Sequence, residues 1–309
     1  MQSSQAEKIK ETARLLGFEL VGVAPAKPVP DYNLFLSWLN KGYAGTMSYL
    51  HRGAERRGDP EKILPGVKSI ICCGLNYFTD QKKSTDRKED EAWISAYAWG
   101  EDYHKILEGK LKRLEEFIQS LSGRARTKTY VDTGAILERS YAAQAGLGWI
   151  GKNSCLINNG IGSFFFLGEI LTTLELDYDK PTFDQCGTCT KCLDACPTQA
   201  FVEPGVLDAR RCLSYLTLEY RGTLTQDLKG HVAGCDICQE VCPYNQAIPL
   251  SQEKGFYPRE GLVAPKIEQL IGTKSPVPRI KQSQWERNIS NIRSSKTIDT
   301  TSESSPETE

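Results

Sequence analysis

Eight of the eleven cysteines in this chain lie in one short stretch, between Cys186 and Cys242. The N-terminus shows no basic-then-apolar signal peptide, so we expect a cytoplasmic location. Disulfides are rare in that compartment, and clustered cysteines there favour metal binding. This segment is therefore expected to fold around metal rather than around disulfides.

The cysteine segment has two similar halves. The first half reads Cys186-x-x-Cys189-x-x-Cys192-x-x-x-Cys196-Pro197, and the second reads Cys235-x-x-Cys238-x-x-x-Cys242-Pro243. The first spacing is that of bacterial two-cluster ferredoxins, in which three cysteines hold one [4Fe–4S] cluster and the fourth ligates the other cluster. The second half lacks one cysteine of the full run.

This crossing rule assigns every ligand. The first cluster takes Cys186, Cys189, Cys192 and Cys242. The second takes Cys196, Cys235 and Cys238, together with Cys212, which is the only cysteine left in the segment. Zinc is the alternative, because paired Cys-x-x-Cys motifs also build zinc ribbons, but a repeated run ending in Cys-Pro fits zinc poorly.

Helical and strand patterns alternate ahead of the cysteines. Helices are expected over 4–17, 31–39, 103–121 and 136–145, and strands over 19–24, 69–78, 127–131, 155–157 and 163–173. The alternation predicts an α/β (α+β) fold with a mixed sheet up to about residue 178. Cys72, Cys73 and Cys155 fall in apolar strands and are expected to be buried as small hydrophobic residues.

The 309 residues are enough for about two domains, and a composition of 39% hydrophobic and 25% charged residues excludes a mostly disordered or coiled-coil chain. No apolar run approaches the ~18–20 residues of a membrane helix. The net charge of −1 gives no global argument for nucleic acid binding. Locally, residues 263–296 carry seven Lys/Arg against two Glu, which suits either tRNA phosphates or a solvated face. Trp285 and Tyr257 could stack on bases or pack internally.

Asp132 is the candidate catalytic acid that position alone indicates. It ends an apolar strand and precedes Thr133-Gly134. An acid at the carboxyl end of a strand beside a glycine turn can face a cleft, although it can equally cap the next helix. No dinucleotide-binding glycine motif stands in the required strand-to-helix context, and no corrinoid Asp-x-His-x-x-Gly motif is complete.

Together, the motifs resemble those of the epoxyqueuosine reductase family. The matching stretches are Glu55-Arg-Arg57-x-Asp59-Pro60, Leu64-Pro-Gly66, Gly100-Glu-Asp-Tyr-His104, Tyr130-Val-Asp132-Thr-Gly134, Gly146-Leu-Gly-Trp-Ile-Gly-Lys-Asn153, Gly162-Ser163 and the cysteine segment with Arg211-Cys212-x-Ser214-Tyr215. The resemblance covers roughly residues 5–290. The sequence shows no match to the helical-repeat extension that many members carry, so the chain resembles a short form of the family.

The resemblance implies a cobalamin cofactor beside the two [4Fe–4S] clusters, in a fold similar to nitroreductases and cobalamin-processing proteins. It implies reduction of epoxyqueuosine to queuosine at the tRNA wobble position, with Asp132 as proton donor. Residues expected to contact cobalamin are Arg57, Lys152, Asn153, Leu156, Leu167 and Ser214.

The expected domains are a cobalamin-binding catalytic domain (1–178), a ferredoxin-like domain (179–250), a basic segment that packs on the core or contacts tRNA (251–296) and a disordered acidic tail (297–309). Expected partners are tRNA carrying epoxyqueuosine and an external low-potential electron donor. We expect a monomer that does not bind membranes.

Two other functions fit the same cofactors. One is a corrinoid reductase of a small molecule, similar to reductive dehalogenases; the absence of a twin-arginine signal and the Asp132 motif disfavour it. The other is an electron-transfer protein without a substrate site, which a failure to bind cobalamin would favour.

Overall fold

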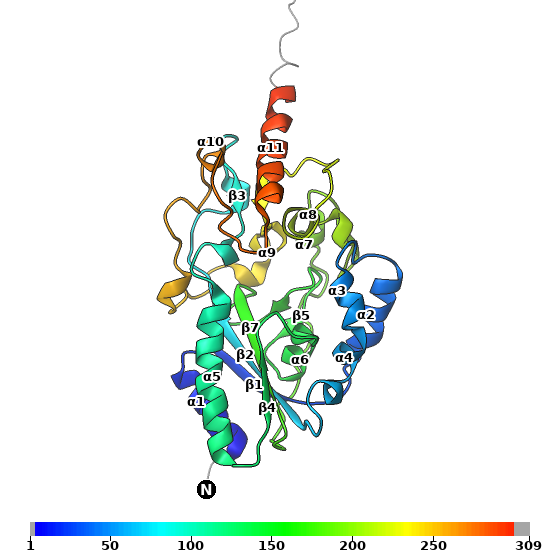
Figure 1. Cartoon of the computed structure of the whole chain (residues 1–309), viewed down its shortest axis with the longest axis vertical. Helices are drawn as coiled ribbons and strands as arrows, with labels where there is room; N and C mark the ends of the chain where they lie inside the picture. Colours follow the sequence, from blue (N-terminus) through cyan, green and yellow to red (C-terminus); the bar gives the residue numbers. More distant parts are fainter. Residues whose placement is uncertain (1–3, 300–309) are drawn as a thin grey trace, which may run out of the picture.

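A computed structural model of the chain describes residues 4–299, and the surroundings of side chains from residue 4 to residue 294. Its centre is a four-stranded sheet in the order β1-β2-β7-β4 (Figure 1). The strands are β1 (Leu20–Pro25), β2 (Ser69–Asn76), β4 (Thr127–Tyr130) and β7 (Phe165–Thr172). Each neighbouring pair runs antiparallel.

The α+β class is confirmed, but the expected mixed sheet is wrong for these four strands. The continuous apolar runs of β2 and β7 are typical of parallel strands, which are buried on both faces. Here both faces are buried because helices cover each side of an antiparallel sheet. Among the described residues, the parallel pairing is that of β3 (Trp93–Ile94) with β10 (His231–Ala233), outside this sheet.

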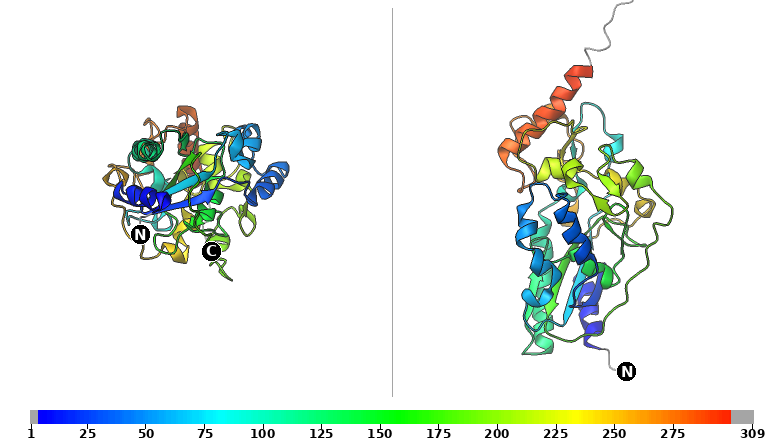
Figure 2. Two further views of the ribbon diagram at one scale, coloured as in Figure 1. Left: turned by 90° about the horizontal axis from the view of Figure 1, so that it is seen from below. Right: turned by 90° about the vertical axis from the view of Figure 1, so that its right-hand side faces the viewer.

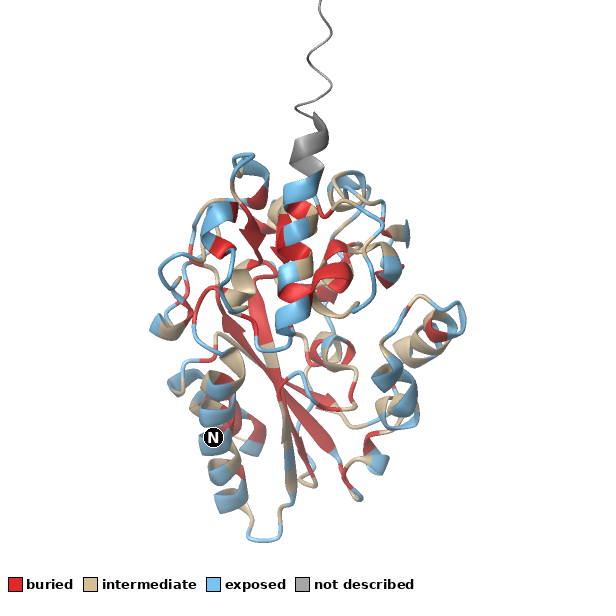
Figure 3. Ribbon diagram, turned by 45° about the horizontal axis from the view of Figure 1, so that its top comes forward, coloured by how far each residue is buried: buried red, intermediate tan, exposed pale blue. Residues whose placement is uncertain are grey.

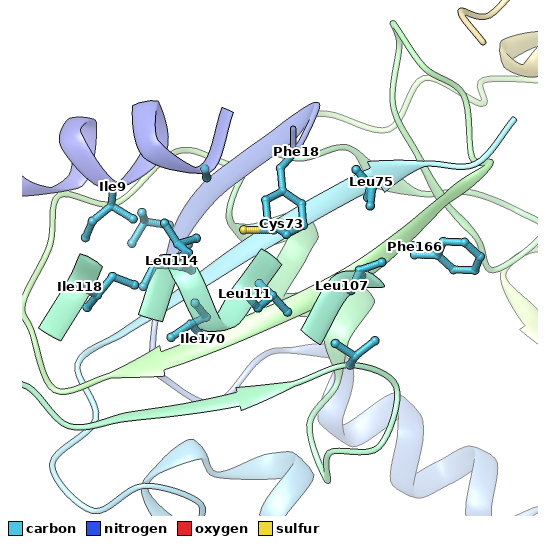
Figure 4. Packing of buried hydrophobic residues seen from close by; sticks show 14 of the residues in the cluster. Ile9, Phe18, Cys73, Leu75, Leu107, Leu111, Leu114, Ile118, Phe166 and Ile170 are labelled. Carbon is cyan, nitrogen blue, oxygen red and sulfur yellow. The ribbon is translucent and has the colours of Figure 1, made fainter. Parts of the chain in front are cut away.

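Two helices cover one face of the sheet, α1 (Gln5–Leu15) and α5 (Tyr103–Leu121). Helix α5 occupies its predicted range because apolar residues recur on one side and because Asp102 accepts the N–H of His104 at its first turn. Figure 4 shows Leu107, Leu111, Leu114 and Ile118 packed between the helices and the sheet. This core fixes the start of α5, and therefore Tyr103, against the sheet.

The opposite face is covered by α6 (Glu138–Gln144) and the short pair β5 (Trp149–Ile150) and β6 (Leu156–Ile157). The glycine-rich turn ahead of β5 has a steric reason. A Cβ atom at Gly148 would lie 2.1 Å from the carbonyl oxygen of Ile157, so only glycine lets the two strands meet.

An arm of short helices lies beside the sheet (Figure 1). It consists of α2 (Asp31–Asn40), α3 (Ser48–Arg52), α4 (Ala54–Gly58) and the 3-10 turn η1 (Pro60–Lys62). The arm is tied to the cysteine segment. The indole of Trp38 donates to the carbonyl of Leu207 (2.6 Å), and the N–H of Thr46 donates to the hydroxyl of Tyr215 (2.8 Å).

A second core forms around β3 and β10, with Trp93 and Trp285 fully buried in it. Its helices are α8 (Leu213–Leu218), α10 (Ile267–Leu270) and α11 (Gln282–Asp299). Figure 3 shows α11 with one face buried and the other exposed. A base-stacking role for Trp285 is therefore wrong, whereas Tyr257 is 42% exposed.

The remaining elements are short. They are η2 (Ser84–Asp86), η3 (Ala96–Ala98), α7 (Lys191–Asp194), β8 (Phe201–Glu203), β9 (Val206–Leu207), η4 (Ala209–Arg211), α9 (Ile237–Glu240), η5 (Pro243–Asn245) and η6 (Lys254–Phe256). The N-terminal helix lies at the opposite end of the molecule from α11 (Figure 2). Across the described part of the chain, no helix combines the length and apolar character needed to cross a bilayer.

Helix α11 corrects one expectation about the C-terminus. The predicted disordered tail was to begin at residue 297, but residues 297–299 belong to α11, and residues 300–309 lie outside the described range. The helix is mostly polar, and its burial rests on Trp285, Ile289 and Ile292, which recur at helical spacing. The domain boundaries remain predictions; β3 precedes the boundary at residue 178 yet packs with β10 in the second core.

Candidate active site

The first four predicted cluster ligands line one cavity. Cys186, Cys189, Cys192 and Cys242, drawn from both halves of the cysteine segment, border a space of about 190 Å³. Lys152 lies at its edge, where its Nζ donates to the carbonyls of Gly187 (2.6 Å) and Cys189 (3.0 Å). The cysteines that the crossing rule combines are therefore neighbours, and a positive charge stands beside them.

The other four predicted ligands are close to one another in pairs. Cys212 lies within electrostatic reach of Cys196 and Cys235, and Cys235 in turn is close to Cys238. Asn153 links this group to the first. Its Nδ2 donates to the carbonyl of Cys238 (3.1 Å), and the residue before it in the chain is Lys152, which binds the first cysteine loop. Their assignment to the two clusters remains a prediction.

The three other cysteines divide differently from expectation. Cys72 and Cys73 are fully buried on opposite faces of β2, as predicted. Cys155 is only half-buried and lies directly before β6, with its thiol beside that of Cys238. Its place next to a predicted ligand could not be read from its apolar sequence neighbours.

Asp132 lies just after β4, the edge strand of the central sheet. The hydroxyl of Tyr103 donates to its Oδ2 at 3.0 Å, and Nη2 of Arg279 lies 3.4 Å from the same oxygen. Within residues 4–294, no hydrogen bond reaches Oδ1, and the side chain is 44% exposed. The helix-cap alternative is wrong, because Leu137 precedes α6 and no side chain caps it.

Two neighbours hold this carboxylate in place. The ring of Tyr103 stacks on Phe166, with 4.1 Å between centroids, and burial and the charge of Asp132 raise the pKa of its hydroxyl. Tyr103 therefore stays a donor. Burial alone would lower the pKa of Arg279, but the carboxylates of Glu219 and Asp132 outweigh it and raise that pKa.

The backbone of Asp132 is held as well. Its φ of 53° lies in the left-handed region, and its N–H donates to Oε1 of Glu138 on α6 (2.9 Å). Sequence reasoning missed Tyr103, Glu138 and Arg279 as site residues.

The six residues predicted to contact cobalamin lie in different parts of the fold. Arg57 on α4 is near Tyr49 and Glu138, and its Nη1 is buried without a hydrogen-bond partner among the described residues. Leu156 is buried and Leu167 half-buried in the core beneath α6, while Ser214 is half-buried next to Cys212. Lys152 and Asn153 instead bind the carbonyls of the cysteine loops. The contacts of all six residues with cobalamin remain predictions.

Two family models match the chain. Residues 57–133, which include Arg57 and Asp132, match the model described as "Epoxyqueuosine reductase QueG, DUF1730". Residues 185–245 match a 4Fe-4S double cluster binding domain. The α+β fold and the double-cluster match indicate an iron–sulfur protein, and the description of the first model makes it a reductase.

Curated relatives extend the match over almost the whole chain. The epoxyqueuosine reductase of Prochlorococcus marinus is 40% identical over 93% of this chain and 96% of the relative. Those of Gloeobacter violaceus (42%, covering 92% and 94%) and Escherichia coli (39%, covering 92% and 79%) agree. The chain belongs to the epoxyqueuosine reductase family.

Solved structures give the same result. A selenomethionine-labelled epoxyqueuosine reductase superposes with a TM-score of 0.83 at 31% identity, over 96% of this chain and 84% of that one. Another, with an epoxyqueuosine-modified tRNA-Tyr stem loop, has a TM-score of 0.83 at 30% identity, covering 95% and 83%. In a third, from Bacillus subtilis, the catalytic aspartate loop is swung out of the active site (TM-score 0.81, 29% identity, 96% and 84%).

Proposed function

We propose that this chain removes the epoxide oxygen of epoxyqueuosine at the wobble position of tRNA, the last step of queuosine synthesis, with Asp132 as the proton donor. The observation that carries the proposal is the Asp132 carboxylate, half-exposed and held through one oxygen by Tyr103 and Arg279. In the Bacillus subtilis relative, the loop named catalytic also carries an aspartate. Membership of the family supplies the substrate class.

The reaction defines what the residues must do. Converting an epoxide to an alkene consumes two electrons and two protons and releases water. The cofactors are cobalamin and two [4Fe–4S] clusters. Bound cobalamin would supply a strongly reducing cobalt centre, and the clusters, held by the eight cysteines of the segment, would supply single electrons. The departing oxygen needs a proton because an alkoxide is a poor leaving group, and positioned acid catalysis is worth ~10²–10⁴-fold.

Asp132 suits this task through its free oxygen. Tyr103 and Arg279 both contact Oδ2, which leaves Oδ1 as the atom from which a proton would reach the substrate. The two contacts fix the direction of the carboxyl plane. Orientation of this kind lowers the barrier because the acid need not be ordered during the reaction.

Arg57 fits a role in holding cobalamin. A buried guanidinium nitrogen without a partner is costly, and the polar side chains of a corrin would supply an acceptor. Leu167 and Ser214 would contact the cofactor from the sheet and from the cluster side. Lys152 and Asn153 would act through the cysteine loops that they bind, between cofactor and clusters.

The location and partners follow from the substrate. We place the reaction in the cytoplasm, where tRNA is modified, with an external low-potential electron donor. We infer that the chain acts as a monomer, because Asp132, its partners and the predicted cluster ligands all belong to one chain.

The test uses protein reconstituted anaerobically with both clusters and cobalamin, a low-potential reductant and tRNA carrying epoxyqueuosine. Mass spectrometry of the nucleoside should show loss of one oxygen atom with the wild type and not with Asp132→Asn. The variant should retain cobalamin and the wild-type iron content. If the wild type binds both cofactors and leaves the nucleoside unchanged, the chain acts on something else, and a small-molecule corrinoid substrate becomes the better proposal.

A further inference from the structure

Glu169 is a buried carboxylic acid and the one charged residue of strand β7. It lies in the middle of β7 and is 0% exposed. Its neighbours across the sheet are Cys72 on β2 and Tyr130 on β4. Among residues 4–294, no hydrogen-bond donor reaches either Oε1 or Oε2. An ionised carboxylate without a donor is among the most costly groups that a protein can bury.

The carboxyl group that faces Glu169 is that of Glu138 on α6. Two carboxyl groups against each other in an apolar surrounding cannot both ionise, so they share one proton. Burial, followed by the charge of Asp132, raises the pKa of Glu138 to about 7. Burial and the charge of Glu138 raise that of Glu169 well above its ordinary value.

The other charged or titratable groups near the pair are those of Arg57, Asp132 and Arg139, the thiol of Cys72, and the phenol of Tyr130, which lies opposite Glu169 on β4. Arg139 follows Glu138 on α6, but its guanidinium donates to the carbonyl of Ser154. Arg57 reaches Glu138 from α4, and Asp132 adds a negative charge to both glutamates. The thiol of Cys72 faces Glu169 from β2, whereas that of Cys73 lies on the opposite face of the strand. Both thiols are neutral, because burial raises the pKa of both. None of these groups supplies Glu169 with a proton donor, and that leaves the shared proton.

Glu138 connects the pair to the active site. Its Oε1 accepts the N–H of Asp132 at 2.9 Å, and Asp132 holds a left-handed φ of 53°. Residues other than glycine seldom adopt that conformation, and aspartate, which tolerates it better than most, is still held there by its surroundings. The hydrogen bond from Asp132 to Glu138 is one of those restraints, and the position of Glu138 depends in turn on what it meets beneath the helix.

We propose that Glu169 is a protonated carboxylic acid that donates to the carboxylate of Glu138, and that Glu138, fixed in this way, holds the backbone of Asp132 in its active conformation. This inference rests on the proposed function of Asp132 as proton donor. Both glutamates are positioning residues, since neither reaches the substrate. Loss of the shared proton at high pH sets two negative charges against each other, moves Glu138 away and releases the Asp132 loop.

Two substitutions at one position separate this role from ordinary packing. Glu169→Gln keeps the shape and a neutral N–H donor toward Glu138, and it cannot ionise. Glu169→Leu keeps the volume and has no donor. Thr172→Val is the matched control, because Thr172 is another fully buried polar residue of β7 and its side chain accepts from the N–H of Leu174, away from Asp132.

The first readout is the pH profile of single-turnover reduction by the reconstituted holoenzyme. Glu169→Gln should stay close to wild type at neutral pH, and its alkaline limb should move up by about one pH unit or more. Glu169→Leu should be slower at all pH values, with the affinity for tRNA unchanged. Thr172→Val should follow the wild type.

The second readout is hydrogen–deuterium exchange of the peptide around Asp132 in the same holoenzymes without tRNA. Exchange should be about fivefold faster in Glu169→Leu, as expected for the loss of one hydrogen bond, and unchanged in Glu169→Gln. Wild-type exchange should rise with pH beyond the intrinsic chemical rate, and that of Glu169→Gln should not. Exchange in this pattern without any reduction of tRNA would overturn the proposed function and leave the positioning role standing.

Equal behaviour of Glu169→Gln and Glu169→Leu in both readouts would overturn the inference, since only one of them can donate. So would an alkaline limb that stays in place in Glu169→Gln. A folding defect in Glu169→Leu would appear as loss of cobalamin or iron. In that case the pH profile and the hydrogen–deuterium exchange of Glu169→Gln, compared with those of the wild type, test the inference by themselves.

Discussion

The guanidinium of Arg279 lies 3.4 Å from Oδ2 of Asp132, although 147 residues separate them in the sequence. The same guanidinium is 2.7 Å from Glu219, which follows α8. The segment leading into α11 therefore reaches across the molecule to the candidate proton donor, and the two halves of the chain meet at this carboxylate.

Replacing Arg279 should weaken the reaction through the orientation of Asp132. We expect Arg279→Ala to slow single-turnover reduction about tenfold, the effect of losing one charge-assisted contact. Arg293→Ala is a matched control, because Arg293 is equally half-exposed and its ion pair is with Glu268. If the two variants have equal rates at saturating tRNA, Arg279 does not position Asp132.

The hydroxyl of Tyr103 can be removed without disturbing its ring. Tyr103→Phe keeps the stack on Phe166 and loses the donor to Asp132. We expect a rate about three- to tenfold lower, with the iron and cobalamin contents of the wild type. Tyr257→Phe, which loses only a bond to the carbonyl of Ser251, should be unaffected. A Tyr103→Phe rate equal to that of the wild type would leave the contact without a catalytic effect.

The fourth ligand of the second cluster can be tested against its nearest competitor. Cys212 and Cys155 both lie close to Cys238, and only Cys212 is assigned as a ligand. Cys212→Ala should lose about half of the iron and sulfide, whereas Cys155→Ala should keep them all. Iron analysis and low-temperature electron paramagnetic resonance of the reduced proteins measure this. The reverse result would make Cys155 the ligand, and zinc in place of iron would exclude the clusters altogether.

His231 should make the fold sensitive to acid. Burial lowers its pKa to about 4, so the folded chain keeps it neutral while the unfolded chain binds a proton from about pH 6.5 downward. The free energy of unfolding is therefore unaffected by this residue above pH 6.5, and it falls by about 3 kcal/mol in all as the pH drops toward 4. The free energy of unfolding, measured with urea, should fall more over this pH range for the wild type than for His231→Gln. The exposed His51 provides the control, since His51→Gln should change nothing.

Local patterns in the sequence determined much of this protein. The cysteine ligands could be grouped because the ferredoxin spacing is contiguous, and the structure brings the first four to one cavity. Helix α5 was predicted residue for residue because its leucines recur at helical spacing and Asp102 precedes them. Asp132 could be singled out because a strand end beside a glycine turn is also a local feature. Each of these signals spans a few residues and needs no knowledge of the partner surfaces.

Only the tertiary structure decided what surrounds Asp132. The contacts of Tyr103 and Arg279 with its carboxylate join residues that are 29 and 147 positions away from it in the chain. Glu138 is only six residues from Asp132, but its contact with the Asp132 backbone depends on how α6 packs on the sheet. The antiparallel order of the sheet, the burial of α11 and the place of Cys155 beside Cys238 are likewise long-range outcomes. Such contacts leave no periodicity in the sequence, because they depend on which surfaces meet after the local elements have formed. The buried carboxyl of Glu169 illustrates the limit: the sequence shows an acid in an apolar strand, and the fold alone places Glu138 against it.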